Sequence, residues 1–304
     1  MKKIKISALS VSLYMMAVVL FVACVKSTST ENVTVGTGTQ NVSLFLTDGP
    51  GAYNNLFLDI RSVEVLVDTS KNTRLHDSCD WERIGSRNAG GDSASLVWNT
   101  LNIKAGLYDI VALKNGIDTL LSATNVFAGN VRLIRIDLGT NSSIVKDSVS
   151  YPLYYPNNFY ILIKLKGDEW EHYTTNSYRL WIDFDVMRSI IESNGRFYLI
   201  PFLRTYVVSK TGAIHGQIAP SIAFPEIVKV FSSTDTLYAL PAKNGEFTVR
   251  GLKDGTYSVY IHSLAYDSLR TTPTNNIYLD STIKNVVIKN ANTVNLGTIN
   301  LRRK

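Results

Sequence analysis

Two aspartates in the second half of the chain are the clearest candidates for chemistry. Asp183 and Asp185 stand two apart in a strand-like segment, so both carboxylates leave the same face, about 7 Å apart. Such a pair can bind calcium, although calcium prefers about six to eight oxygen ligands. It can also share acid and base roles, but carboxylates of one strand do not flank a substrate as glycosidase acids do. The structural alternative is that the pair caps the turn starting at Val186, or pairs with Arg179 or Arg188.

A run of aromatic residues gives a second candidate site. Sugar rings stack on aromatic faces, and a tyrosine adds a polar tip, so carbohydrate is the ligand that this composition favours. The alternative is ordinary packing of an edge strand, because proline is confined to sheet edges and tyrosine is common in β-sheets. The five candidate ligand-binding residues lie around two prolines and are Tyr151, Tyr154, Tyr155, Phe159 and Tyr160.

The sequence offers little support for catalysis or for a cofactor. Its four histidines are far apart, and none has a spacing typical of a zinc site. No serine lies in a G-x-S-x-G motif, and no glycine-rich phosphate loop leads from a strand into a helix. We therefore expect a protein without catalytic residues and without a cofactor.

The first residues predict export. A lysine-rich start leads into an apolar run from about Ile6 to Ala23, which ends at Cys24. An uncleaved membrane helix is one alternative, because about 20 apolar residues span a bilayer. Ala23 directly before Cys24 resembles the lipobox of bacterial lipoproteins, which implies cleavage before Cys24 and acylation of its thiol. That resemblance implies a membrane partner through the lipid anchor and a place in the cell envelope, at the outer membrane.

Charge and cysteine content set further limits. Removing Lys2, Lys3 and Lys5 with the signal lowers the formal net charge from +6 to +3, which does not favour a nucleic-acid partner. Cys79 is then the one cysteine outside the anchor, so no disulfide framework is expected. Its acidic neighbours disfavour a thiolate, and we expect a half-buried structural residue.

The alternation of apolar and polar residues predicts the fold. Most segments have a period of two and are bounded by Gly, Pro, Asn and Asp, which is typical of antiparallel strands with one solvated face. This predicts an all-β protein of two antiparallel β-sandwich domains. A change of pattern over residues 186–193 predicts one short helix. The strands of the first sandwich are expected at 42–47, 56–67, 81–84, 108–113, 131–138, 159–165, 178–185 and 197–208.

A different texture begins at Gly212, with shorter strands and two glycine-centred turns. Asn244-Gly245 and Asp254-Gly255 both favour tight hairpins, because these residues accept positive φ. We therefore predict a small separate sandwich. The predicted division of the chain is a signal peptide at 1–23, a flexible tether at 24–40, a first sandwich at 41–209 and a second sandwich at 210–304.

Short segments of both sandwiches resemble known families. Residues 212–216 and 244–257 are similar to carboxypeptidase-regulatory-like modules, transthyretin-type or Ig-like sandwiches that have no catalytic residues. The first sandwich resembles the domain-of-unknown-function family numbered 4382, found in secreted bacterial and archaeal proteins, in its segments 46–53, 60–65, 128–136, 183–190 and 198–204. Neither of these two resemblances implies an activity, because function depends on sites and not on folds.

These patterns favour a lipid-anchored, non-catalytic envelope protein that binds carbohydrate. The alternative is a structural or adhesive surface component that contacts envelope proteins through sheet edges. An enzyme that uses Asp183 and Asp185 is a third hypothesis.

Overall fold

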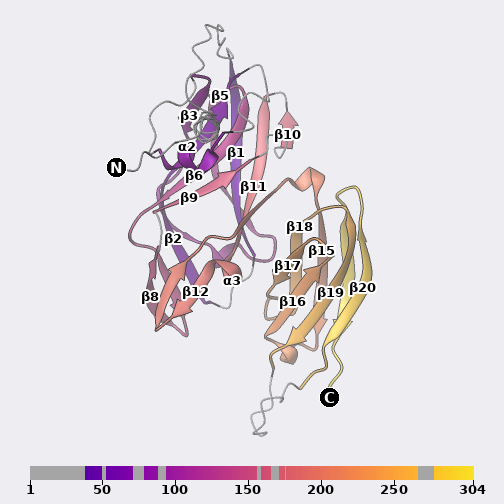
Figure 1. The fold of residues 1–304 in the computed structure, drawn as a ribbon. Coiled ribbons are helices and arrows are strands. Elements are labelled where there is room, and N and C mark those ends of the chain that lie inside the picture. Colours follow the sequence, from indigo (N-terminus) through magenta and orange to yellow (C-terminus); the bar gives the residue numbers. More distant parts are fainter. Residues whose placement is uncertain are drawn as a thin grey trace, which may run out of the picture.

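The computed structural model places β-strands in two sandwiches, which Figure 1 shows side by side. We call them the N-terminal sandwich (residues 39–206) and the C-terminal sandwich (residues 212–300). The all-β fold class is as the sequence predicts. The predicted anchor residue, Cys24, lies outside the described residues. Those residues are 38–49, 53–70, 79–87, 94–155, 159–165, 171–174, 176–265 and 277–304.

The first sheet of the N-terminal sandwich has five strands. They are β1 (Thr39–Gly49), β5 (Asp118–Phe127), β10 (Glu171–Thr174), β11 (Ser177–Asp185) and β14 (Leu203–Tyr206). The order is β10-β11-β1-β5, and β14 also pairs with β11. In β1, Val42, Leu44 and Leu46 are buried while alternate residues face outward, which turns one face of the sheet towards the core.

The second sheet of the N-terminal sandwich has nine strands around the long strand β2. They are β2 (Asn55–Asp68), β3 (Leu96–Thr100), β4 (Gly106–Asp109), β6 (Asn130–Leu138), β7 (Ser143–Lys146), β8 (Val149–Tyr154), β9 (Tyr160–Lys164), β12 (Ile190–Ser193) and β13 (Arg196–Leu199). The main path is β12-β13-β8-β7-β2-β6-β9, and β3 and β4 also pair with β2. Strand β9 therefore ends this path with one free edge among the described strands.

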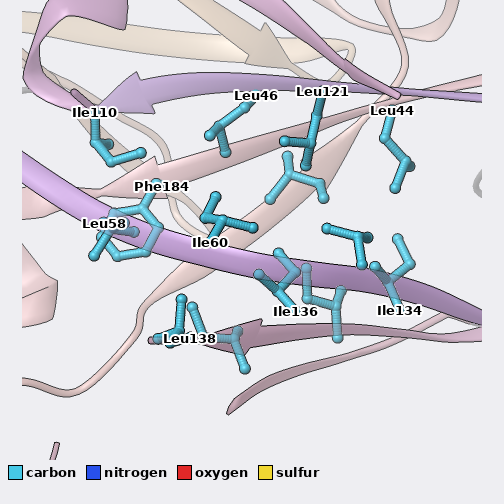
Figure 2. Close-up of a cluster of buried hydrophobic side chains, with 14 of the residues drawn as sticks. Leu44, Leu46, Leu58, Ile60, Ile110, Leu121, Ile134, Ile136, Leu138 and Phe184 are labelled. Carbon is cyan, nitrogen blue, oxygen red and sulfur yellow. The ribbon is translucent and has the colours of Figure 1, made fainter. Parts of the chain in front are cut away.

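The core of the N-terminal sandwich fills the space between these sheets. Figure 2 shows Leu44 and Leu46 pointing from one layer towards the other, from which Ile60 points back. Phe184 of β11 is one of the largest fully buried side chains. Burial of such apolar surface contributes about 25 cal/mol per Å², which makes this cluster the main source of stability.

The C-terminal sandwich packs two smaller sheets around a separate apolar cluster. One sheet has the order β18-β15-β21 and the other β17-β16-β19-β20. Phe247, Val259 and Ile261 lie fully buried between them. The strands are β15 (Gly212–Ala219), β16 (Glu226–Phe231), β17 (Thr236–Ala239), β18 (Glu246–Leu252), β19 (Gly255–Ser263), β20 (Ser281–Ile288) and β21 (Thr293–Asn300).

The sequence predicts purely antiparallel sheets, but three of the sheets contain a parallel pair of strands. Strand β1 runs parallel to β11, β8 runs parallel to β13, and β15 runs parallel to β21. Period-two alternation specifies which face a side chain takes, but it does not specify the direction of the neighbouring strand.

The strand predicted at 81–84 is wrong, because these residues form the helix α2 (Trp81–Ser86). Asp80 caps it, since its side chain accepts a hydrogen bond from the backbone amide of Arg83. The apolar residues Trp81 and Ile84 are three apart, which places them on one face of a helix but on opposite faces of a strand. The capping aspartate was the signal that distinguishes the two.

The helix predicted at 186–193 is shorter than expected. Helix α3 (Val186–Ser189) makes a single turn, and strand β12 follows at once. The strand predicted at 197–208 is also divided, into β13 and β14, which belong to different sheets. Pro201 lies between them and has no amide hydrogen for a sheet ladder.

The two glycine-centred turns do not close hairpins. Asn244-Gly245 leads into β18, and Asp254-Gly255 connects β18 with β19, which belongs to the other sheet. Gly245 has φ +82, and a Cβ there would lie 2.0 Å from the carbonyl oxygen of Ile218. Glycine is therefore needed at a crossing between sheets, and the dipeptide alone does not distinguish that crossing from a hairpin.

Cys79 is half-buried against a small cluster around α2, as expected, but it is disulfide-bonded. Its partner lies outside the described residues. This corrects the expectation of a fold without a bridge. Within the described ranges, no helix is long and apolar enough to cross a membrane.

Candidate functional site

A groove opens beside the free edge of β9. It offers about 240 Å³ to water-sized molecules. One wall is β9 with Tyr160, Ile161 and Leu162, and the other is the connection 199–203 between β13 and β14. Tyr155 also lines this β9 groove, as does Glu82 of α2.

The structure does not bring the five predicted aromatic residues onto one surface. Tyr151 is half-buried and packs at a tilt on Phe197, with ring centroids 5.0 Å apart. Tyr154 is 40% exposed and lies beside Tyr198, at 5.7 Å, with Arg196 over its ring. Alternation along β8 sends these two tyrosines to opposite faces of the sheet.

The other three predicted aromatic residues gather at the groove. Tyr155 and Tyr160 line it, and Phe159 meets Tyr155 edge to face, with ring centroids 5.3 Å apart. Phe159 is 56% exposed. The loop and the first residue of β9 therefore carry a local aromatic cluster with faces available to a ligand.

Polar groups in the β9 groove have defined positions. The guanidinium of Arg135 lies 4.0 Å from the ring centroid of Tyr160 and also pairs with Asp137 at 2.8 Å, which fixes that ring. The Tyr155 hydroxyl is buried and has no hydrogen-bond partner at full bonding distance and angle. Burial raises the pKa of Tyr155, and the nearby Ser142 hydroxyl opposes part of that rise. This phenol is thus a neutral donor and acceptor.

The two predicted metal ligands face the junction between the sandwiches. Asp183 and Asp185 line a cavity there, which we call the junction cavity. Asp185 caps α3 and forms an ion pair with Arg188 at 2.6 Å, which is the structural alternative to a metal-binding role. Among the described residues, no group of three or more His, Cys, Asp or Glu side chains is arranged to hold a metal ion.

Asp48 also lines the junction cavity. Its side chain is buried, and neither carboxylate oxygen makes a hydrogen bond. Burial, followed by the charges of Asp183 and Asp185, raises the pKa of Asp48 well above its ordinary value, although the nearby Val186 amide favours the charged form. In the register of β1 with β11, Thr47 pairs with Asp183 and Asp48 pairs with Phe184.

Ion pairs connect the two sandwiches around this cavity. Arg204 of β14 bonds Asp235 before β17 at 2.8 Å, and Arg250 of β18 reaches Asp118 of β5 at 3.4 Å. Asp118 also accepts a hydrogen bond from the Trp181 indole. These pairs are partly exposed, so their main contribution is to set the mutual orientation of the sandwiches.

Comparison with known proteins identifies one family. A family model described as "Domain of unknown function (DUF4382)" matches residues 39–201. No curated protein matches the chain.

Several solved structures share a weak likeness. The shaft pilin SpaA from Lactobacillus rhamnosus GG (D295N mutant) is 10% identical, with 88% of this chain and 100% of that chain covered and a TM-score of 0.23. BcpA, the major pilin subunit of Bacillus cereus, is 10% identical, with 88% and 71% covered and a TM-score of 0.23. A leucine-rich repeat protein from Bacteroides thetaiotaomicron is 9% identical, with 87% and 26% covered and a TM-score of 0.21. Similarity at this level carries no argument about function.

Proposed function

The chain belongs to the DUF4382 family of domains of unknown function, and we propose that it is a lipid-anchored, non-catalytic envelope protein that binds carbohydrate. The β9 groove is the binding site in this proposal. In this proposal the C-terminal sandwich is a carboxypeptidase-regulatory-like module that acts as a spacer or as a second contact surface.

One observation carries the carbohydrate proposal: Tyr155 and Tyr160 line one groove, and the exposed Phe159 packs on Tyr155 beside them. A sugar presents apolar C–H faces and hydroxyl groups, so it fits aromatic walls with a few fixed polar groups. The groove volume of 240 Å³ is below the range of about 300–1,000 Å³ typical of pockets for drug-sized ligands. It suits one or two rings of a longer glycan that runs along the surface.

Substitutions that separate the two groups of tyrosines test this proposal. Binding of the full chain to a glycan array identifies a ligand, and calorimetry then compares variants. Tyr160→Ala should weaken binding about fivefold or more, because stacking on an aromatic ring contributes on the order of 1 kcal/mol or more. Tyr155→Phe keeps the ring and should weaken binding about fivefold, which corresponds to one neutral hydrogen bond.

Tyr154→Ala is the matched control, because this side chain lies on the opposite face, next to Tyr198. It should bind glycans like the wild type. No glycan bound by the wild-type chain, or an equal loss in Tyr154→Ala and Tyr160→Ala, would contradict the assignment of the groove.

The free edge of β9 supports the alternative function, a structural or adhesive protein that contacts partners through sheet edges. Exposed Phe159 and Ile200 lie at the groove beside this edge and would pack on an added strand. Hydrogen exchange distinguishes the two functions. An added strand would protect the backbone amides of β9 from hydrogen exchange. A bound glycan would leave the same amides free to exchange.

Acylation of Cys24 is the prediction that tests the anchor. Cells fed a radiolabelled or alkyne fatty acid should label the wild-type chain, and Cys24→Ser should abolish the label and leave the chain unprocessed. The chain has only two cysteines, so the anchor requires that Cys24 is not the disulfide partner of Cys79. Mass spectrometry of the mature protein should find the acylated residue, whereas an intact bridge to Cys24 would refute the anchor.

A further inference from the structure

The C-terminal sandwich exposes apolar side chains at one end. Ile222 is 75% exposed, more than any other large hydrophobic side chain in the described part of the chain. Single exposed hydrophobic residues are ordinary in soluble proteins, but a group of them marks a contact surface. Four such residues, which we call the apolar end, gather where β15 and β19 finish and β16 and β20 begin: Ile222, Phe224, Leu264 and Leu279.

Backbone hydrogen bonds hold the segments of the apolar end side by side. The amide of Leu264 donates to the carbonyl of Pro225 at 2.7 Å, and the amide of Leu279 donates to the carbonyl of Arg302 at 2.8 Å. A further bond, from the amide of Leu301 to the last residue of β15, joins residues 301–304 to the same group. Figure 1 shows the C-terminus at this end of the sandwich, which extends past the N-terminal sandwich.

The loop that presents Ile222 has a fixed backbone. Its 3₁₀ turn η4 (Ser221–Ala223) follows Pro220, whose ring fixes φ. Ala223 is fully buried, and its carbonyl accepts a hydrogen bond from the Ser263 hydroxyl at 2.5 Å. Ile222 is therefore exposed on an ordered turn. Contact with a partner surface would then cost little further ordering of the loop, which favours binding.

The charges beside the apolar end are mostly positive. Among the described carboxylates next to it, Glu226 is buried and Asp280 bonds the Tyr260 hydroxyl at 2.6 Å. At the neighbouring start of β18, Lys243 and Glu246 offset each other. Three exposed cations, which we call the basic rim, follow β21: Arg302, Arg303 and Lys304.

This combination matches the chemistry of an anionic bilayer surface. Apolar side chains enter the boundary between lipid headgroups and acyl chains, while arginine and lysine remain at the level of the phosphates and are attracted by the negative surface. Three of the four side chains of the apolar end are aliphatic, which suits acyl chains better than sugar rings. The adjacent basic rim supplies the complementary charge.

We infer that the apolar end and the basic rim dock the C-terminal sandwich on an anionic lipid surface. Ile222 and Phe224 enter the bilayer interface, and the basic rim contacts lipid phosphates. This contact depends neither on the β9 groove nor on acylation of Cys24, because it is made by side chains of the C-terminal sandwich itself.

Photolabelling from inside the bilayer tests the inference on the full chain. A lipid-soluble diazirine is loaded into vesicles of phosphatidylcholine and phosphatidylglycerol, and mass spectrometry identifies the labelled residues. Ile222 and Phe224 should be labelled. Val287, which is 52% exposed at the opposite end of β20, should remain unlabelled. The apolar run 6–23 should be labelled in every sample, which shows that the chain has reached the bilayer.

Vesicles of phosphatidylcholine alone measure the electrostatic part of the contact. Labelling of Ile222 should decrease about fivefold or more on these vesicles, because they lack the negative surface that attracts the basic rim. Labelling of the apolar run 6–23 should not change, since its insertion does not require anionic lipid.

Two variants separate the apolar and the charged contributions. Ile222→Ser should reduce labelling of Phe224 about fivefold or more, because it removes the most exposed apolar side chain of the loop. Arg302→Gln combined with Arg303→Gln should reduce labelling of Phe224 about tenfold or more. Lys289→Gln is the matched control, since it removes an exposed cation at the opposite end of β20 and should label like the wild type.

Four results would overturn the inference. They are unlabelled Ile222 and Phe224 on anionic vesicles, equal labelling of Val287, equal labelling of Ile222 on neutral and anionic vesicles, and wild-type labelling in the Arg302→Gln, Arg303→Gln variant. Each variant changes exposed side chains, so its Tm should match that of the wild type.

Discussion

Replacing Arg132 with Met is expected to lower the free energy of unfolding by about 3–5 kcal/mol, because it removes a cation that bonds the buried carboxylate of Asp68. Arg132 of β6 is 6% exposed and bonds Asp68, at the end of β2, at 3.3 Å. Helix α2 places Trp81 beside the Arg132 guanidinium, whose central carbon lies 6.0 Å from the centroid of the indole ring. Methionine keeps the length of the side chain and removes only the charged group.

Urea unfolding of the full chain measures this effect, with Lys146→Met as the matched control. Lys146 bonds Glu192 at 2.6 Å, but both side chains are exposed, so the control should lose no more than about 1 kcal/mol. Adding Asp68→Asn to Arg132→Met should recover part of the loss, because the uncompensated charge is then gone. Equal losses in Arg132→Met and Lys146→Met would show that the buried pair contributes nothing beyond an exposed one.

Replacing Glu226 with Gln is expected to stabilise the protein above pH 7 and to remove a pH dependence of its stability. Glu226 begins β16, is 1% exposed, and neither of its carboxylate oxygens has a hydrogen-bond partner. Burial raises the pKa of Glu226 from 4.5 to about 7. Below about pH 4.5 the carboxyl is protonated in both states and costs nothing. Between pH 4.5 and 7 the unfolded state gives up its proton first, so stability falls as the pH rises.

The full shift corresponds to an upper limit of about 3 kcal/mol, reached above pH 7. Urea midpoints at pH 5 and pH 8 measure it in the full chain. Glu226→Gln should narrow the difference between the two midpoints, whereas Glu246→Gln, an exposed residue of β18, should leave it unchanged. The prediction is wrong if the wild type and Glu226→Gln lose the same stability between these two values of pH.

The aromatic run shows how far residue pattern reaches towards a site. Composition marked Tyr155, Phe159 and Tyr160 as binding candidates, and these three lie at the β9 groove. The same composition also marked Tyr151 and Tyr154, which the pleat of β8 directs to opposite faces. Spacing in the sequence measures distance along a strand, so it cannot say which opposing segment will close a groove. Residues 199–203 do so here because β13 and β14 belong to different sheets.

The aspartates show what spacing in the sequence cannot predict, namely which remote groups surround each carboxylate. The spacing of Asp183 and Asp185 correctly placed them on one face, but only their neighbours decide what each carboxylate does. Asp48 lies 135 positions earlier in the chain and joins them through the parallel pairing of β1 with β11. Its burial, and the missing hydrogen bonds of Asn115 and Tyr206, depend on contacts between segments remote in sequence. No local pattern contains that information.

The sequence by itself determined the fold class, an all-β protein of two sandwiches with strands of period two, and its short motifs indicated the family. It also predicts an export segment that ends at Cys24. Tertiary structure decided which strands are parallel, that residues 81–86 form a helix, and which polar groups meet in the β9 groove and the junction cavity. The physical reason is that alternation records whether a side chain is buried. The identity of its partners follows only from pairing and packing over the whole chain.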